Sequence, residues 1–574
     1  MTQTVSSVIL DVAKRHGVKY VFGLPAAQIG QIMDGAAKDP HFTYVTTRHE
    51  EAAGHMAHAV AKLTNTAAIC FGTVGPGATN MVPGVACGWA CNVPMLVLTP
   101  NNQSFLVDPG QDLLQHVDQQ GLYRPITKWN TSIKYPRRAG ELAERAIHIT
   151  HAGRPGPVHL DIPVDIGYAE CNYDLNTRPL LPRPRPAASA DDVAAVADAL
   201  RKAKRPMLLA GGGVARAEGV EAFRQLLSLT GFVASTSCNG KGTVPLDHPG
   251  HVGSGGVMAG RAFVRASQEA DVIVAVGCKF SSFTPINKPP AYPVPEGQRI
   301  IQIDIDPETL GRNVPASLGI QADAKLFLEQ LNSALEATTF DADRDWIQRM
   351  ADAHISYRGE VDAVADQITA PGTNRLNEAA IAREFARHVP DDAIICVDGG
   401  QIMEWALSYL NPRDPYSFVF GPGMGHLGMG LPFANAAKLV HPDRPVFLVT
   451  GDGAMGMTGQ ELETAVRYGL NIIVLVCNDS FWGMYRPLGE HIMNNPDFGT
   501  KLTDVDFARV AEGYGCWSER VETLDSLAPA IERAQAANRP AVIEITCDYT
   551  LHPMDSFWGE VIMDSVAMVP AAAG

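Results

Sequence analysis

The sequence lacks the features that mark several large classes of proteins. No apolar run approaches the roughly 20 residues that a membrane-spanning helix needs, and the first residues show no basic segment followed by an apolar one, as a secretory signal would. The ten cysteines form no Cys-x-x-Cys pair, and a reducing cytosol fits them. The formal net charge of −16 disfavours nucleic acid or an acidic membrane as the main partner. We therefore expect a cytoplasmic protein with no nucleic-acid or membrane partner.

Strand-like and helix-like stretches alternate along the whole chain. Apolar runs at residues 66–71, 272–276 and 446–450 are separated by stretches of helical character, a pattern typical of parallel α/β domains. At 574 residues the chain is also too long for one hydrophobic core. The fold class that we expect is α/β, with three doubly wound parallel-sheet domains.

Two stretches are expected to link these domains. Residues 176–189 contain several prolines, which block regular structure, and residues 367–374 form a polar stretch around a Pro-Gly pair. The domains that result are residues 1–180, 190–340 and 372–574.

Two strands predicted in the last domain both end in polar residues. The first runs directly into Gly451-Asp452-Gly453-Ala454, and the second, at residues 472–476, runs into Cys477-Asn478-Asp479. The distance between them fits one crossover, so their carboxyl ends lie side by side, where open α/β sheets bind ligands. The glycines let the backbone approach a phosphate, and the carboxylates offer oxygen ligands for Mg²⁺. The sequence therefore predicts a magnesium–diphosphate site.

This arrangement resembles the cofactor motif of thiamine diphosphate (ThDP) dependent enzymes, and the resemblance covers essentially the whole chain. It implies a pyrimidine-binding, a central and a diphosphate-binding domain. It also implies that Mg²⁺ is held by Asp452, by Asp479 and by the main-chain carbonyl of Phe481. The family usually has an Asn-Asn pair where this chain has Asn478-Asp479, so Asn478 is the alternative ligand.

The resemblance further implies an activating carboxylate in the N-terminal domain. ThDP becomes reactive when a carboxyl group is hydrogen-bonded to its aminopyrimidine in a desolvated site. The stretch at residues 48–57 resembles the RHE-x-x-A-x-H-M-A segment of acetolactate synthases and benzaldehyde lyases, which places that carboxylate at Glu50. Glu51 is expected to be an exposed acid at a helix N-terminus. Gly75 and Asn80 lie in a further family stretch and are expected to contact the cofactor.

Two glutamines are expected to act on the substrate. Gln28 stands where benzaldehyde lyases carry a histidine, and Gln115 is assigned to a polar contact with the reacting carbonyl. His116, beside it, is expected to be structural.

The glycine-rich stretch at residues 421–430 has two interpretations. It contains G-x-G-x-x-G, but position 448, near which a dinucleotide-binding loop would need an acidic residue, is Leu448. By resemblance, Leu427 instead holds the cofactor bent, and Gly425 contacts its aminopyrimidine. His426 takes a position usually filled by Ser or Thr, and no role is assigned to it. The remaining cofactor contacts implied are Gln401, Gly453, Ala454, Trp482 and Met484.

The branch of the family is indicated less directly. Segments at 211–213, 239–242 and 302–306 resemble those that hold FAD in acetolactate synthases, or ADP in acyl-CoA lyases. Three substrate positions depart from the synthases: residues 280–283 lack their arginine, Leu488 replaces a tryptophan, and Leu114-Gln115-His116 replaces Phe-Gln-Glu.

We therefore expect first a benzaldehyde lyase-like lyase and carboligase that acts on 2-hydroxy ketones or aldehydes through a carbanion at C2 of ThDP. An acetolactate synthase-like transferase on pyruvate and a 2-hydroxyacyl-CoA lyase are the alternatives. A non-catalytic or flavin-dependent relative is disfavoured because Glu50, Asp452 and Gln115 are all retained. In such enzymes the active site lies at a dimer interface, which implies a homodimer and, as the expected assembly, a homotetramer.

Overall fold

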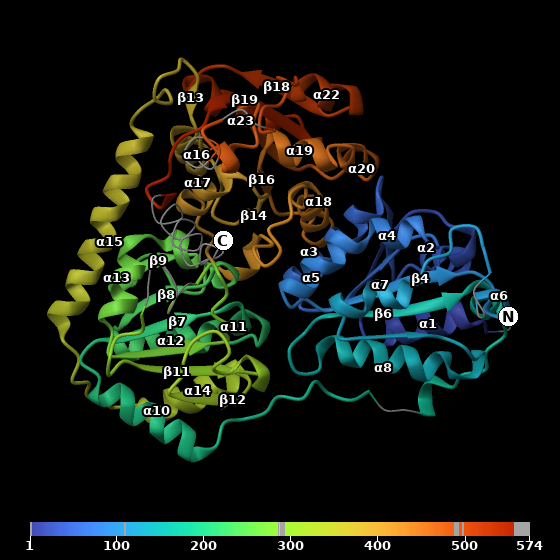
Figure 1. Ribbon diagram of the computed structural model, residues 1–574, viewed down its shortest axis with the longest axis horizontal. Coiled ribbons are helices and arrows are strands. Elements are labelled where there is room, and N and C mark those ends of the chain that lie inside the picture. Colours follow the sequence, from blue (N-terminus) through green and yellow to red (C-terminus); the bar gives the residue numbers. More distant parts are fainter. Residues whose placement is uncertain are drawn as a thin grey trace, which may run out of the picture.

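Three parallel β-sheets form the framework of the protein, seen in a computed structural model that describes residues 3–107, 111–177, 180–284, 286, 293–486, 489, 493–495 and 499–555. Helices cover both faces of the sheets, and the three α/β units follow one another as N-terminal, central and C-terminal domains (Figure 1). The predicted fold class is confirmed. No helix in the described part of the chain is both long and apolar enough to cross a membrane.

The N-terminal domain contains a six-stranded sheet in the order β2-β1-β3-β4-β6-β5. Its four inner strands are continuous buried runs because both faces are covered, whereas the two edge strands are only partly buried. The strands are β1 (Tyr20–Gly23), β2 (Thr43–Thr46), β3 (Ala68–Phe71), β4 (Met95–Asn101), β5 (Trp129–Ser132) and β6 (Pro157–Pro163). The helices are α1 (Val5–Arg15), α2 (Gly30–Lys38), α3 (Glu50–Thr64), α4 (Pro76–Asn80), α5 (Val82–Ala90), α6 (Ser104–Val107), α7 (Gln119–Tyr123), α8 (Ala139–His151) and α9 (Val164–Tyr168).

The central domain contains a second six-stranded sheet, in the order β12-β11-β10-β7-β8-β9. The strands are β7 (Pro206–Ala210), β8 (Val233–Thr236), β9 (His251–Ser254), β10 (Val272–Val276), β11 (Arg299–Asp304) and β12 (Leu318–Gln321). The helices are α10 (Ala190–Lys202), α11 (Gly212–Arg216), α12 (Val220–Thr230), α13 (Arg261–Glu269) and α14 (Ala324–Leu335). The long helix α15 (Arg344–Ala365) then runs along the side of the molecule to the C-terminal domain (Figure 1).

The C-terminal domain has a seven-stranded sheet in the order β13-β19-β17-β16-β14-β15, with β18 beside β19. The strands are β13 (Leu376–Asn377), β14 (Ile394–Val397), β15 (Phe418–Val419), β16 (Val446–Gly451), β17 (Ile473–Asn478), β18 (Trp517–Val521) and β19 (Ala541–Asp548). The helices are α16 (Glu378–Arg387), α17 (Gln401–Tyr409), α18 (Gly430–Val440), α19 (Asp452–Thr458), α20 (Glu461–Arg467), α22 (Phe507–Tyr514) and α23 (Leu527–Ala536).

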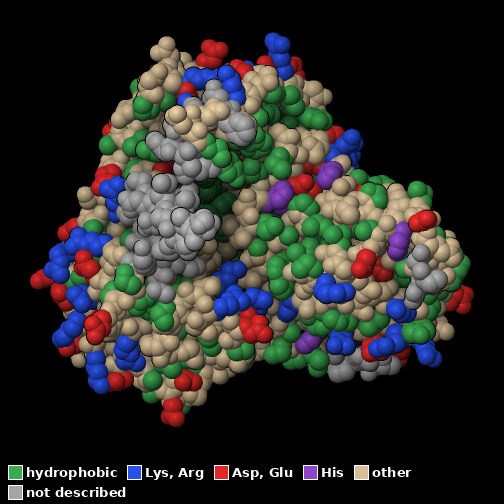
Figure 2. All heavy atoms as spheres, viewed as in Figure 1, with side chains coloured by type: hydrophobic (Ala, Val, Ile, Leu, Met, Phe, Trp, Pro, Cys, Tyr) green, Lys and Arg blue, Asp and Glu red, His purple; other side chains and the backbone are tan. Residues whose placement is uncertain are grey.

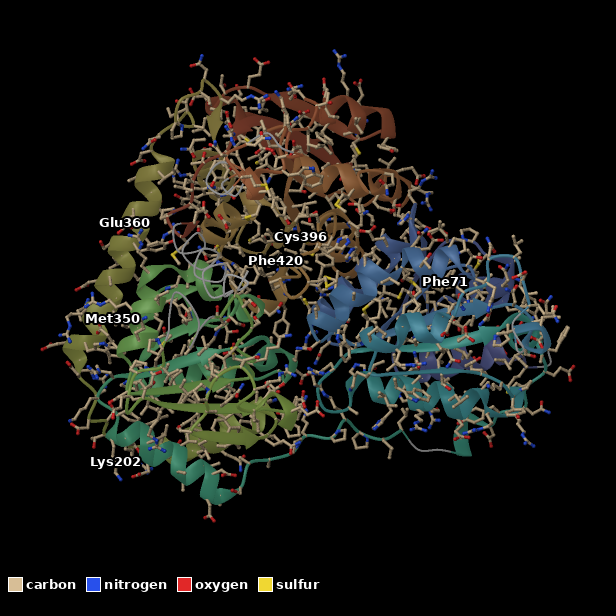
Figure 3. The ribbon with its side chains drawn as sticks, viewed as in Figure 1. Phe71, Lys202, Met350, Glu360, Cys396 and Phe420 are labelled. Atoms are coloured by element: carbon tan, nitrogen blue, oxygen red, sulfur yellow. The ribbon has the colours of Figure 1, made fainter. Side chains whose placement is uncertain are left out.

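Apolar packing continues from domain to domain. One hydrophobic core extends through all three domains, and a second fills the other face of the first sheet. Cys396 of β14 and Phe420, which follows β15, lie close to the centre of the molecule (Figure 3). The buried Lys62 of α3 donates to the Phe420 carbonyl at 3.3 Å, so the N-terminal domain reaches this centre too.

The turn before α3 is held by the C-terminal domain of the same chain. Glu461, buried at the start of α20, accepts the backbone N–H groups of Arg48 and of His49, each at 3.0 Å. The Thr46 N–H donates to the Tyr468 hydroxyl at 2.8 Å. Helix α3 then packs along α18. The helix that begins with Glu50 is therefore positioned by residues from the other end of the chain.

Candidate active site

A cleft opens at the carboxyl ends of β14, β16 and β17, and Figure 2 shows the surface hollowed where the C-terminal domain meets the central domain. This is the edge at which parallel α/β sheets bind ligands. Four loops that follow strands meet there. The predicted residues that line the cleft are Gln401, Gly425, Leu427, Asp452, Gly453, Ala454, Asp479, Phe481, Trp482 and Met484.

The carboxyl groups of Asp452 and Asp479 both lie in this cleft, close enough for the charge of one to affect the pKa of the other. The Gly453 N–H donates to Asp452 Oδ1 at 2.7 Å, whereas Asp452 Oδ2 is buried and has no partner among the described residues. The Phe481 N–H donates to Asp479 Oδ1 at 3.0 Å. Burial raises the pKa of Asp452 to about 6, and burial together with the charge of Asp452 raises the pKa of Asp479 to about 7. This buried oxygen set fits a hard divalent cation, which would favour both charged forms.

Asn478 is committed to other contacts. Its amide Nδ2 donates to Glu544 Oε1 at 2.8 Å and to the Val505 carbonyl at 2.9 Å, and its Oδ1 accepts the Ser480 N–H at 3.2 Å. Its side chain therefore anchors the loop that follows β17. Of the two neighbours, Asp479 is the one that faces the cleft.

The glycine-rich stretch at 421–430 is fixed by a buried carboxylate. Asp398, directly after β14, accepts the N–H groups of Gly428 at 3.0 Å and of Gly430 at 2.8 Å. Gly425 has φ +63°, a conformation that favours glycine. Leu427 lies against the turn after β14, since a Cβ at Gly399 would be 2.5 Å from its Cδ2 atom. Asp398 was not predicted as a site residue. The feature that could have identified it is a carboxylate placed between a strand and two glycines.

The N-terminal residues predicted for the site form a group of their own. Glu50, the first residue of α3, is buried, and its Oε2 accepts from Asn80 Nδ2 at 3.1 Å. Gly75 lies at the start of α4 with φ +70°. Gln28 accepts from Thr73 Oγ1 at 3.2 Å. The segment from Thr73 to Asn80 thus contacts both Gln28 and Glu50.

Gln115, which was predicted to contact the reacting carbonyl, lies in an exposed turn. Its backbone is left-handed, with φ 62°, and its side chain is exposed. A Cβ at Gly75 would lie 2.0 Å from the Gln115 carbonyl oxygen, so this loop packs on Gly75 through its backbone. Gln119, four residues on, is the buried glutamine: it accepts the Gly75 N–H at 3.1 Å and donates to Asp161 Oδ1 at 2.8 Å. Sequence reasoning missed Gln119.

The two groups do not share one cavity within a chain. Within the described ranges, the residues that line the cleft belong to the C-terminal domain, apart from Phe283 of the central domain, and Glu50 is not among them. Phe283 is the last residue of the segment 280–283, which lacks the arginine of the acetolactate synthases. Leu488, another position that departs from the synthases, lies outside the described residues.

A second cavity lies at the carboxyl ends of β7, β10 and β11 of the central domain, and residues of the other two domains complete its lining. All three segments predicted to hold a nucleotide contribute to it, through Gly212, Asn239 and Asp304 among others. Several cationic side chains surround it, and burial lowers the pKa of Arg216 to about 10. The basic residues in its lining are Lys62, Arg154, Arg183, Arg216 and Lys279.

Comparison with known protein families agrees with this architecture. The N-terminal thiamine pyrophosphate (ThDP) binding domain model matches residues 3–122, the central domain model of the same enzymes matches residues 193–331, and the C-terminal binding domain model matches residues 398–545. The chain belongs to the thiamine pyrophosphate enzyme family. It is a ThDP-dependent enzyme of the transferase or carboligase type.

Curated relatives align over nearly the whole chain. A probable acetolactate synthase large subunit of Methanocaldococcus jannaschii is 32% identical over 95% of this chain and 92% of its own length. An acetolactate synthase large subunit of Corynebacterium glutamicum is 30% identical over 91% of this chain and 83% of its own length. An acetolactate synthase of Mycobacterium avium is 30% identical over 94% of this chain and 87% of its own length.

Proposed function

We propose that the protein is a ThDP- and Mg²⁺-dependent carboligase of the acetolactate synthase type, which joins two molecules of pyruvate to give acetolactate and CO₂. The observation that carries this proposal is the end-to-end similarity to acetolactate synthases, at up to 32% identity. The benzaldehyde lyase-like reaction, our first expectation, has less support, because the relatives favour the synthase alternative.

The cleft supplies groups for each part of the cofactor. Asp452, Asp479 and the Phe481 carbonyl would hold Mg²⁺, and Gln401 with the Gly453-Ala454 backbone would hold the diphosphate. Leu427 would pack against the cofactor, and the Gly425 carbonyl would accept a hydrogen bond from its amino group. When bound, ThDP supplies a nucleophilic carbon that adds to the substrate carbonyl and stabilises the charge left after CO₂ departs.

Glu50 would complete the site from a neighbouring subunit. Its carboxyl group is buried, which favours sharing a proton with the aminopyrimidine ring nitrogen over exchange with water. The hydrogen bond from Asn80 to Oε2 orients it and leaves Oε1 near Gly77. Because the cleft of one chain includes no described residue of the N-terminal domain, we propose a homodimer as the smallest active unit and a homotetramer as the assembly.

We also propose that the central cavity binds a nucleotide, FAD or ADP. The cationic side chains around it suit a diphosphate, and Asp304 and Asp323 stand in its lining. Release of the bound compound by heat, followed by its absorption spectrum, separates FAD from ADP.

A second candidate activity follows from Phe283. An aromatic ring lines the cleft where acetolactate synthases carry an arginine, so a carboxylate on the acceptor would lose a cationic partner. An aldehyde or hydroxy-ketone substrate needs no such partner, and this favours a carboligase and lyase of acyloins.

Product analysis by NMR separates the two activities. Purified enzyme with ThDP and Mg²⁺ is given pyruvate in one tube and benzoin in another. Acetolactate and CO₂ from pyruvate support the synthase. Aldehyde from benzoin without CO₂ from pyruvate contradicts it and supports the lyase. No product in either tube would contradict both and direct the search to acyl-CoA substrates.

A further inference from the structure

Three side chains from opposite ends of the chain meet beside the candidate active site. Glu51 and His55 lie one turn apart on α3, and His426 comes from the glycine-rich stretch at 421–430. Glu51 Oε1 is 3.6 Å from His55 Nε2 and 3.6 Å from His426 Nε2. One ligand atom from each residue lies within 4.8 Å of the other two. Figure 2 shows histidine side chains at the surface where the N-terminal and C-terminal domains meet.

The polar atoms of this cluster lack other partners. Within the described part of the chain, Glu51 Oε1, both ring nitrogens of His55 and His426 Nδ1 are buried without a hydrogen bond. The His55 side chain is 0% exposed. Unpaired buried groups of this kind are costly, so several in one place indicate a missing partner. Glu51, which was expected to be an exposed helix-end acid, is instead covered by the loop that carries His426, with a side-chain exposure of 13%.

The spacing suits a metal ion better than hydrogen bonds. A separation of 3.6 Å is too long for a hydrogen bond between side chains. A tetrahedral ion with ligands at about 2.0–2.1 Å holds neighbouring ligand atoms about 3.4 Å apart, which is close to the 3.6 Å from Glu51 Oε1 to each of the two imidazole nitrogens.

The protonation states also agree with a ligand role. Burial lowers the pKa of His55 to about 4, which leaves its ring neutral near pH 7. Burial pushes the pKa of Glu51 upward, but the neighbouring histidines hold it below its usual value. A neutral imidazole and an ionised carboxylate are the forms that bind metals.

We propose that Glu51, His55 and His426 bind a divalent transition-metal ion, for which Zn²⁺ is the best match. Two imidazoles and one carboxylate are ligands typical of zinc, whereas Mg²⁺ prefers oxygen ligands throughout. Three protein ligands leave a fourth position for water. Water would reach this position past His426, because 17% of the His426 side chain is exposed.

The metal would connect two elements of the cofactor site. Glu51 follows Glu50 directly, and His426 lies between Gly425 and Leu427. An ion shared by Glu51 and His426 therefore fixes the start of α3 against the glycine-rich stretch. The proposal does not depend on which carbonyl compound the enzyme uses.

The test uses the holoenzyme with ThDP and Mg²⁺ in excess, so that the Asp452–Asp479 site is filled. Co²⁺ is titrated in as a probe, because tetrahedral Co²⁺ absorbs visible light strongly and octahedral Co²⁺ weakly. We expect one equivalent of Co²⁺ per chain to give the strong absorption, and Zn²⁺ to displace it. In His426→Thr and Glu51→Gln the affinity should fall by more than about 100-fold, since loss of an outer-shell partner alone costs about 10–100-fold.

Two controls isolate the site. His58 lies one turn beyond His55 on α3, is also buried, and stands outside the cluster, so His58→Gln should keep the Co²⁺ absorption. Asp479→Ala should weaken Mg²⁺ binding and leave the Co²⁺ absorption intact. Only weak absorption in the wild type, or an unchanged Co²⁺ affinity in a His426→Thr protein with the wild-type circular dichroism spectrum, would overturn the proposal.

Discussion

Gly453 lies so close to Trp482 that a Cβ atom on Gly453 would be 2.6 Å from the Trp482 ring. The first residues of α19 and the loop after β17 thus form a single surface of the cleft. The Trp482 ring therefore lies beside the Gly453 backbone, which would approach the diphosphate.

The first prediction concerns this contact. Gly453→Ala forces the Trp482 ring away, and overpacking of this kind costs about 1–3 kcal/mol, so ThDP affinity should fall by roughly 10-fold or more. Fluorescence titration with ThDP in the presence of Mg²⁺ measures the affinity. Gly456→Ala is the matched control on the same helix, because a Cβ there meets nothing within 4 Å. Equal affinities in the two variants would contradict the prediction.

The second prediction concerns the carboxylate pair. The pKa values of Asp452 and Asp479 are raised to about 6 and about 7, so these groups hold protons in the folded state that they release when unfolded. Without Mg²⁺ their contribution to stability is therefore lost as the pH rises from about 4 to above 7. The melting temperature of the metal-free protein should fall over this window less steeply in Asp479→Asn than in wild type.

Mg²⁺ provides the control for this experiment. Saturating Mg²⁺ should raise the wild-type melting temperature most at high pH, and much less so in Asp479→Asn. If Asp479→Asn bound Mg²⁺ and ThDP as wild type does, Asp479 would not be a ligand.

The third prediction concerns Glu50. Glu50→Gln keeps the size of the side chain and its contact with Asn80, so ThDP should still bind. Turnover should fall by about 10²–10⁴-fold, the usual contribution of a group that transfers a proton. Steady-state rates and a ThDP titration on the same preparation separate the two effects. An unchanged rate would remove Glu50 from the mechanism.

The fourth prediction concerns the acceptor. Phe283→Arg introduces a cationic group at the cleft wall, so the ratio of acetolactate formed from pyruvate to acyloin formed from added aldehyde should rise, because a carboxylate gains a charged partner. NMR of competition mixtures measures this ratio, and Phe283→Leu is the uncharged control. Equal ratios in the two variants would mean that Phe283 does not contact the acceptor.

The fold could be predicted because its evidence is local. Strands covered on both faces are continuous apolar runs, and 272–276 became β10 without a change of bounds. That the residues predicted for the C-terminal site lie together could be predicted for the same reason. Asp452 and Asp479 follow directly after two adjacent parallel strands, so the topology alone brings them to one edge.

Other residues could not be predicted because distant segments decide their surroundings. Gln115 and Gln119 lie in one short stretch, and a left-handed turn at Gln115 leaves its side chain exposed while Gln119 is buried. The expected exposure of Glu51 was wrong because the loop that covers it is hundreds of residues away. His426 had no assigned role for the same reason, since its partners belong to α3.

The contact between Glu461 and the turn at Arg48 and His49 also bears on how the chain is made. The two ends of this contact are separated by 412 residues or more. At about 5–20 residues per second, a ribosome needs about 20–80 s to cover that distance. The N-terminal sheet emerges first, yet the peptide that presents Glu50 has to wait for α20 before it is anchored. A nascent or truncated chain that ends before α20 would thus carry a complete first sheet, while the turn at Arg48 and His49 would still lack its anchor.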